Sequence, residues 1–541
     1  MSYDLIINNG RIINGTGNPW FRGDIGIKEG KIVKICNNLK EDAKKTIDAS
    51  KLIICPGFID IHSHTDYILP INRSQESTLY QGVTTTVTGM CGDGMAPIPV
   101  GMEEEFKEKM GTIDPALAEF DYPYHTFKEY LDYNERKRNP GNLAFLIGYG
   151  NLRWAGGQGG EDRDATPEEM EKMIKFLREA MEAGAFGMST GLIYAPQVFA
   201  STKELIELAK VVAEYNGYYF SHIRGEGENV IKAVKEVIEI VEQSGCAGGQ
   251  IAHHKVSGKP YWGASNETIR LMEEANDRGV SISCDQYPYN RGMSSLMTAL
   301  PPWVRKGKNE DILKRIKKPE IQEKIKQDVI NGIEGWENWI RDEGMENLYI
   351  STVVSDKWKD VAGKNLIEVT ALKEKSDDWE TYFDLLIDNE LGVMITIQSM
   401  NEEDICRIMT SRYQMIGTDG FGIPASFSVG AYHPRCFGTY PRVLGKYVRE
   451  EKIMTLEQAI RKMSSFPAQR IGLQDRGLLI EGNWADIVIF DPENIKDKAT
   501  YLHPYQLPEG IPHVIVNGEI VIHDGKRRRK SPGKILLHSS N

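Results

Sequence analysis

Short apolar runs separated by turn residues fill the first fifty positions of the chain. DLIINNGRIING, GDIGIKEGKIVKI and KTIDASKLI mix β-branched residues with polar ones, and Gly and Asn mark the reversals. WADIVIFD and PHVIVNGEIVIHDGK, near the other end, have the same character. We therefore expect residues 1–56 and 475–541 to pair into one small β-sandwich domain.

The middle of the chain, residues 57–474, alternates strand-like apolar runs with helical stretches. Eight such runs occur: CPGFIDIHSH, GVTTTVTGMCG, LAFLIGYGN, GAFGMSTGL, YYFSHIRGE, GQIAHHKVSG, VSISCDQYPY and YQMIGTDG. Repeated strand, loop and helix units imply parallel strands joined by right-handed crossovers. The pattern therefore predicts an α/β fold, a TIM-type (β/α)8 barrel.

The helices between these runs have recognisable starts. TPEEMEKMIKFLREAMEAG opens with Thr166 as N-cap, Pro167 in the first turn and Glu169 three residues after the cap. STKELIELAKVVAEYNG begins in the same way, with Ser201 and Glu204. Between strands seven and eight, at about residues 301–380, we expect an insertion that acts as a lid.

Composition narrows the class of protein. The 541 residues are 40% hydrophobic and 26% charged, which is ordinary for a globular chain. A net charge of -12 argues against nucleic-acid binding, and we assign no function to the basic run KRRRK at 526–530. The start lacks a signal-peptide pattern and no long apolar run occurs, so we expect a cytoplasmic protein without a membrane partner. Seven scattered cysteines do not suggest a disulfide framework.

Metal-binding side chains follow several of the predicted strands. In DIHSHTDY two histidines stand at i and i+2, so both imidazoles point to the same side. A lone buried His or Cys is more often a core residue, and an Asp in GTDG is often a turn former. Here imidazole, thiol and carboxylate groups all converge on the carboxyl ends of barrel strands, which predicts a zinc site. The candidates are His62, His64, Cys91, His222, His253 or His254, and Asp419.

The predicted barrel with these candidate metal ligands resembles the D-aminoacylase (N-acyl-D-amino-acid deacylase) family of the amidohydrolase superfamily. The stretches that carry the resemblance are PGFIDIHSHTD, GVTTTVTGMCG, STGLIYAP, SHIRGEGE, AHHKVSG, DQYPY, MIGTDG, HPRCFGTYPRVLGKYVRE and ADIVIFDP. They cover almost the whole chain outside 303–379. The resemblance implies zinc-dependent hydrolysis of an N-acyl-D-amino acid to a carboxylate and a free D-amino acid.

The resemblance also implies roles for the metal-binding candidates. Cys91, His222 and His253 resemble the ligands of a tight zinc, and His62 and His64 those of a second, weaker site, with Asp419 beside the metal. His254 is the alternative to His253, but the strand period lets only one of them face the centre. Many amidohydrolases with two metals use a carbamylated lysine from strand four, whereas GMSTGL has none. The family uses the cysteine thiolate instead.

The mechanism that follows assigns acid and base work to Asp419. The zinc supplies hydroxide at neutral pH, and Asp419 takes a proton from the water and later gives one to the leaving amine. By resemblance, Lys255, Tyr194 and Tyr287 hold the substrate carboxylate.

One stretch departs from the family pattern. YPYNRGMSS has Met293 where the family places a serine that contacts the carboxylate. Ser294 is one replacement, and Arg291 is another that would suit a substrate with an extra acidic group. His433 and Arg435 in HPRCFG resemble a family motif and are either supporting site residues or parts of a surface turn.

Two other interpretations stay open. A related amidohydrolase acting on cyclic amides or dipeptides, of the hydantoinase, dihydroorotase or isoaspartyl dipeptidase type, would use the same barrel and metals. A non-catalytic scaffold is the other, although a scaffold has no physical need for these groups to meet. The sequence leaves open whether the chain forms a homo-oligomer.

Overall fold

Both ends of the chain contribute to one nine-stranded sheet. A computed structural model describes residues 2–111, 113–427 and 432–539. The sheet has the order β21-β20-β19-β18-β5-β1-β2-β3, with β4 beside β1. β5 and β18 join the two ends in antiparallel pairing. The bounds are β1 Leu5–Ile12, β2 Phe21–Lys28, β3 Lys31–Cys36, β4 Thr46–Asp48, β5 Ile53–Pro56, β18 Ile487–Phe490, β19 His513–Val516, β20 Glu519–His523 and β21 Lys526–Arg527.

Parallel strands, all from the middle of the chain except one near the C-terminus, form two further sheets. One has the order β22-β8-β7-β6 and the other β17-β13-β12-β11-β10-β9, and every neighbouring pair in them is parallel. Each of the eight strand-like runs of the sequence contains a strand of these sheets. The bounds are β6 Phe58–Asp60, β7 Val83–Thr88, β8 Asn142–Phe145, β9 Ile147–Gly148, β10 Gly187–Gly191, β11 Tyr218–His222, β12 Gly248–Ile251, β13 Ile282–Gln286, β17 Gln414–Ile416 and β22 Ile535–Leu536.

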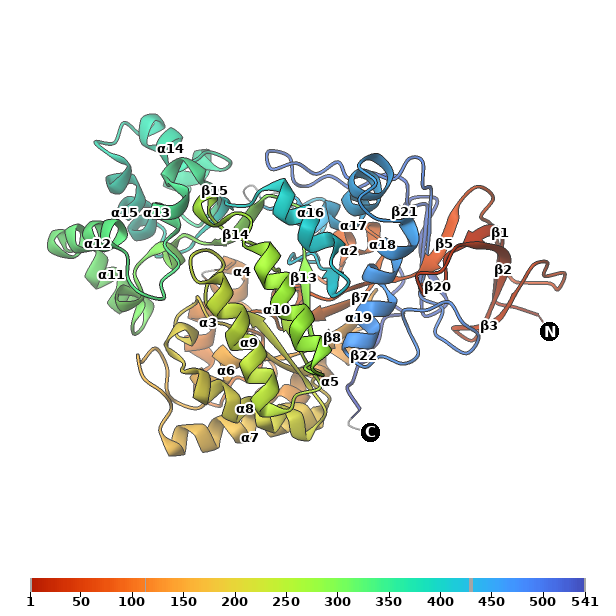
Figure 1. Ribbon diagram of the computed structural model, residues 1–541, viewed down its shortest axis with the longest axis horizontal. Helices are drawn as coiled ribbons and strands as arrows, with labels where there is room; N and C mark the ends of the chain where they lie inside the picture. Colours follow the sequence, from red (N-terminus) through yellow and green to blue (C-terminus); the bar gives the residue numbers. More distant parts are fainter. Residues whose placement is uncertain (1, 112, 428–431, 540–541) are drawn as a thin grey trace.

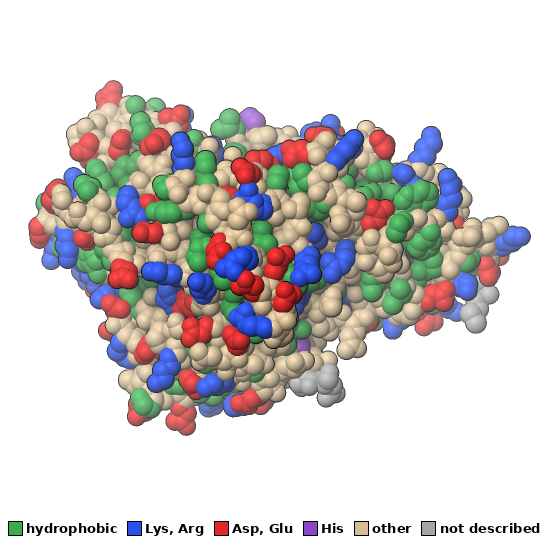
Figure 2. Space-filling view, viewed as in Figure 1, with side chains coloured by type: hydrophobic (Ala, Val, Ile, Leu, Met, Phe, Trp, Pro, Cys, Tyr) green, Lys and Arg blue, Asp and Glu red, His purple; other side chains and the backbone are tan. Residues whose placement is uncertain are grey.

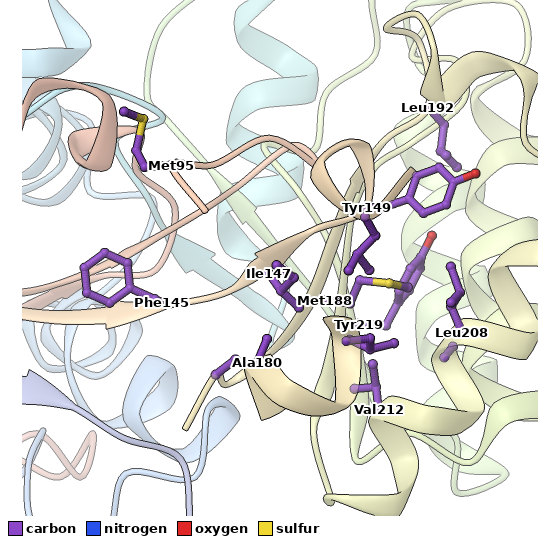
Figure 3. Close-up of a cluster of buried hydrophobic side chains, with 14 of the residues drawn as sticks. Met95, Phe145, Ile147, Tyr149, Ala180, Met188, Leu192, Leu208, Val212 and Tyr219 are labelled. Carbon is purple, nitrogen blue, oxygen red and sulfur yellow. The ribbon is translucent and has the colours of Figure 1, made fainter. Parts of the chain in front are cut away.

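Helices between the strands cover the parallel sheets. Thr166 caps α7 (Pro167–Ala183) in a capping box with Glu169, and the Ser201 side chain caps α8 (Thr202–Glu214), which confirms both predicted helix starts. Figure 3 shows how strand and helix side chains meet in the buried layer between them. The fully buried members include Ile147, Met188 and Tyr219 from strands and Ala180, Leu208 and Val212 from helices.

The remaining helices outside the insertion lie along the same stretch of chain. They are α1 Thr65–Ile68, α2 Glu76–Tyr80, α3 Glu103–Gly111, α4 Pro115–Ala118, α5 Phe127–Lys137, α6 Tyr149–Ala155, α9 Val230–Ser244, α10 Ser265–Asp277, α16 Glu402–Thr410, α17 Arg435–Arg442, α18 Leu456–Met463 and α19 Ser465–Arg470. None of the helices in the described part of the chain combines the length and the apolar character needed to cross a membrane.

The segment of residues 291–398, inserted between β13 and β17, has its own sheet and hydrophobic core. Its antiparallel strands are β14 (Arg291–Ser295), β16 (Val393–Gln398) and β15 (Leu348–Val353), in that order. Its helices are α11 Asn309–Ile316, α12 Pro319–Asn331, α13 Trp339–Glu343, α14 Leu366–Leu372 and α15 Asp378–Asp388. These helices lie at the opposite end of the molecule from the nine-stranded sheet (Figure 1). The unit reaches beyond the predicted 301–380 on both sides.

Candidate active site

Metal-binding side chains from five parallel strands meet at one point. His62 and Cys91 follow β6 and β7, His222 ends β11, and His253 and Asp419 follow β12 and β17; all five are buried. Parallel strands bring their carboxyl ends to the same edge, so residues far apart in sequence become neighbours there. The sequence singled out each of these residues, and the structure brings them together.

Three of these residues have left-handed backbone conformations. The φ angles are 55° at Cys91, 34° at His253 and 48° at Asp419. Residues with a Cβ seldom adopt positive φ, and such strain gathers at functional sites where the surrounding structure enforces it. At this edge, three residues therefore have an unfavourable backbone conformation that directs their side chains toward the site.

The spacing of the side chains fits a metal ion. The Cys91 sulfur lies 3.6 Å from His62 Nε2 and 3.5 Å from His253 Nε2. Zinc bonds of about 2.3 Å to sulfur and 2.0–2.1 Å to nitrogen place two tetrahedral ligands about 3.6 Å apart. Neither ring nitrogen of buried His222 has a hydrogen-bond partner among the described residues, which leaves both free to bind metal.

The candidate ligands form overlapping groups. His62, Cys91 and His253 make one, His62, His64 and Asp419 a second, and in each the ligand atoms lie within 4.8 Å of one another. The Asp419 Oδ1 atom is 3.1 Å from His64 Nε2 and 3.4 Å from His62 Nε2. The donor set, with Cys91 in the first group and Asp419 in the second, therefore fits zinc.

Electrostatics keep the two acidic groups ionised. Burial opposes the Cys91 thiolate, but positive charge on His253 and His62 holds the pKa of this thiol well below its ordinary value. Burial also opposes the Asp419 carboxylate, yet the Arg435 guanidinium, 2.7 Å away, holds its pKa well below the usual range. The thiolate is the form of cysteine that binds metal.

Two carboxylates orient the histidines from outside. Asp285 Oδ1 lies 3.0 Å from His62 Nδ1, and Glu226 Oε1 lies 3.1 Å from His253 Nδ1. Such contacts fix the ring orientation and strengthen an imidazole as a ligand. Sequence reasoning missed both carboxylates, although Asp285 stands in DQYPY and Glu226 four residues after His222.

A cavity of about 200 Å³ opens beside these groups. Its walls include Tyr194, Lys255, Tyr287 and Ser294, which are four of the five predicted substrate contacts. Arg291, the fifth, is absent from that lining. Its guanidinium instead lies between the rings of Tyr349 and Tyr501, 3.6 and 4.4 Å from their centroids.

The comparisons with known proteins agree with this geometry. Residues 45–261 and 417–522 match the model of the Amidohydrolase family. A D-aminoacylase of Alcaligenes xylosoxydans xylosoxydans is 32% identical over 99% of this chain and 98% of its own length. An N-acyl-D-glutamate deacylase from the same organism is 34% identical over 99% and 97%. The chain belongs to the D-aminoacylase family of amidohydrolases.

Solved structures support the same assignment. The N-acyl-D-glutamate deacylase of Bordetella bronchiseptica, crystallised with zinc and a phosphonate mimic of the tetrahedral intermediate, has a TM-score of 0.82. It is 31% identical and covers 99% of this chain and 100% of its own. A D-aminoacylase structure gives a TM-score of 0.81 at 30% identity with the same coverage. A D-hydantoinase with a TM-score of 0.57 at 16% identity shares the fold alone.

Within this D-aminoacylase-family site, His253 and its neighbour His254 face different surroundings. His254 Nε2 lies 2.7 Å from the Thr268 hydroxyl on α10, away from Cys91. Burial, with the charge of Lys255, lowers the pKa of His254 to about 4. The geometry therefore agrees with the expectation that only one of the two histidines faces the centre, and that residue is His253, which the resemblance implied.

The residues of HPRCFG divide into two roles. His433 is buried, its Nδ1 accepts a hydrogen bond from the Arg435 amide, and its Nε2 lies 2.9 Å from the Arg291 carbonyl oxygen. It therefore supports the loop. Arg435 lines the cavity, pairs with Asp419 and lies over the Tyr287 ring at 4.6 Å.

Proposed function

We propose that the protein is a zinc-dependent deacylase of N-acyl-D-amino acids. The observation that carries the proposal is the Cys91 thiol between His62 and His253, next to Asp419 and open to the cavity. Cys91, His222 and His253 would hold one zinc tightly, and His62, His64 and Asp419 would hold a weaker second one. When bound, zinc lowers the pKa of water to about 7 and polarises a carbonyl group.

The protein's own residues supply the proton transfers. Asp419 accepts a proton from the attacking water and returns it to the amine nitrogen as the amide C–N bond breaks. One amide and one water thus give one carboxylic acid and one amine. Arg435 keeps Asp419 ionised and positioned for this role.

The far side of the cavity would hold the amino-acid part of the substrate. Lys255, Tyr194 and Tyr287 line it and offer an ammonium and two hydroxyl groups to the α-carboxylate. Ser294 lies 3.5 Å from the Tyr194 hydroxyl and takes the place of the missing family serine.

The cavity favours a substrate with a neutral side chain. Lys255, 2.5 Å from Glu226, would also bind the α-carboxylate, and Arg435 is paired with Asp419, so no Lys or Arg of the described lining is left for a second substrate carboxylate. The wall built by the insertion is largely apolar, with Met293, Trp339, Met394 and Ile397. Because Arg291 lies outside the lining, the reason for expecting an extra acidic group disappears.

The framework around the site is part of the same proposal. We propose that the parallel strands close into one eight-stranded barrel, with β8 and β9 counted as one strand and β22 left outside it. The parallel bridge between Ser63 and Gly420, next to β6 and β17, supports this closure. The β-sandwich domain of residues 1–56 and 475–541 and the lid role of the insertion belong to the same proposal, as does a cytoplasmic location. Acidic and basic side chains of the described residues are intermixed on the face in Figure 2, and no large patch of one charge marks a surface for a macromolecular partner there.

The test measures amine release by zinc-loaded protein from N-acetyl-D-methionine, N-acetyl-L-methionine and N-acetyl-D-glutamate. We expect turnover of the D substrates only, with a higher kcat/KM for methionine. Asp419→Asn should lose about 10²–10⁴-fold in kcat, the usual contribution of general acid–base catalysis. Full activity of Asp419→Asn would refute the mechanism, and opening of hydantoins without amide hydrolysis would refute the reaction.

A further inference from the structure

Two histidines and an aspartate meet on strands of the nine-stranded sheet that supply none of the active-site groups. Antiparallel pairing of Val514 with Ile522 puts His513 at the start of β19 opposite His523 at the end of β20. Directly opposite residues of an antiparallel pair share one face of the sheet. The two imidazole Nδ1 atoms are 3.2 Å apart.

A tight turn brings the third group back to the histidines. Asp524 and Gly525 form the two-residue link between His523 and Lys526, which pair across β20 and β21. Their φ angles are 49° and 67°, as a type I′ hairpin requires. The Asp524 carboxylate consequently lies 3.8 Å from His513 Nε2 and 3.7 Å from His523 Nε2.

We propose that His513, His523 and Asp524 form a second transition-metal site, independent of the active site. One nitrogen of each ring and one carboxylate oxygen lie within 4.8 Å of one another. Two nitrogen ligands of a tetrahedral zinc are about 3.3 Å apart, given bonds of 2.0–2.1 Å, which matches the 3.2 Å between the two Nδ1 atoms. The Asp524 oxygens lie nearer the Nε2 atoms, so the exposed carboxylate would rotate to reach a metal held by both Nδ1 atoms. Imidazole and carboxylate ligands suit Zn²⁺, Ni²⁺ or Cu²⁺.

Burial differs across the site. The His513 side chain is 7% exposed, whereas those of His523 and Asp524 are 35% and 73% exposed. The metal would therefore enter from solvent and keep water on its open side. Bound there, it would tie β19 to the turn between β20 and β21.

The experiment counts zinc ions in the full chain after dialysis against buffered Zn²⁺. We expect His523→Asn to hold one zinc ion per chain fewer than the wild type at saturation. Asp524→Asn should need a several-fold higher zinc concentration for half-saturation, because Asn keeps the left-handed turn but removes the charge. The matched control His503→Asn, at an exposed histidine of the same region, should bind as the wild type does.

Zinc uptake by His523→Asn and Asp524→Asn equal to that of the wild type would overturn the proposal. Circular dichroism spectra of the variants show whether they fold. Copper binding gives a second readout, since Cu²⁺ held by two imidazoles shows nitrogen hyperfine splitting in its electron paramagnetic resonance spectrum. The splitting assigned to this site should disappear in His523→Asn and persist in His503→Asn.

Discussion

Cys91 shows how much of the site the sequence contains at the scale of single residues. The run GVTTTVTGMCG predicted a buried strand followed by the Cys91 thiol. The structure places the sulfur between His62 and His253. Glu226 and Asp285 were missed because their role depends on side-chain directions across neighbouring strands. The sequence pattern identifies the residues that follow the strands, but it does not show which carboxylates contact the far side of the histidine rings.

We expect Glu226→Gln to lower the free energy of unfolding by about 3–5 kcal/mol, because it leaves buried Lys255 as an unpaired cation. Urea denaturation of metal-free protein measures the change. Glu228→Gln is the matched control, since Glu228 forms a solvent-exposed pair with Arg341 and should change stability by less than about 1 kcal/mol. Equal losses in the two variants would contradict the assigned role of Glu226.

Adjacent histidines offer a second test at this scale. We expect His253→Asn to lose tightly bound zinc and His254→Asn to keep it, because only His253 faces Cys91. Metal analysis of the folded fraction of each variant measures the difference. Loss of zinc from His254→Asn with retention in His253→Asn would reverse the assignment.

At the scale of elements, periodicity located the parallel strands but not the start of the insertion. The eight apolar runs stood out because these strands are buried. β14, by contrast, reads RGMSS and has one apolar side chain, so no alternation marks it as a strand. It forms because β16 pairs with it along its whole length.

Lys462 on α18 gives a prediction about pH. Its ammonium is buried and donates hydrogen bonds to the carbonyl oxygens of Ser411 and Gln414 at the start of β17. Burial lowers its pKa from 10.5 to about 7. Between these values the unfolded chain holds the proton and the folded chain does not, so this group's contribution to stability rises with pH.

We therefore expect the difference in free energy of unfolding, Lys462→Met minus wild type, to fall by about 2–3 kcal/mol between pH 7 and pH 9. Urea denaturation at the two pH values measures it. A difference that stays constant, or grows with pH, would show that Lys462 keeps its ordinary pKa in the folded protein.

At the scale of the whole molecule, three parts of the chain contribute to one site. The parallel strands supply the candidate metal ligands, α17 contributes Arg435, and the insertion contributes Met293, Ser294, Trp339 and Met394 to the cavity. A D-aminoacylase and an N-acyl-D-glutamate deacylase match this chain almost equally well, at 32% and 34% identity. Side-chain preference therefore depends on local cavity contacts, which overall similarity does not determine.

The most direct test of the account is a measurement of D-selective amide hydrolysis before and after metal removal. We expect zinc-loaded protein to release amine from N-acetyl-D-methionine and not from its L enantiomer. Dialysis against a chelator should abolish the activity and added Zn²⁺ should restore it. Equal turnover of the two enantiomers, or full activity in the chelated protein, would contradict the account.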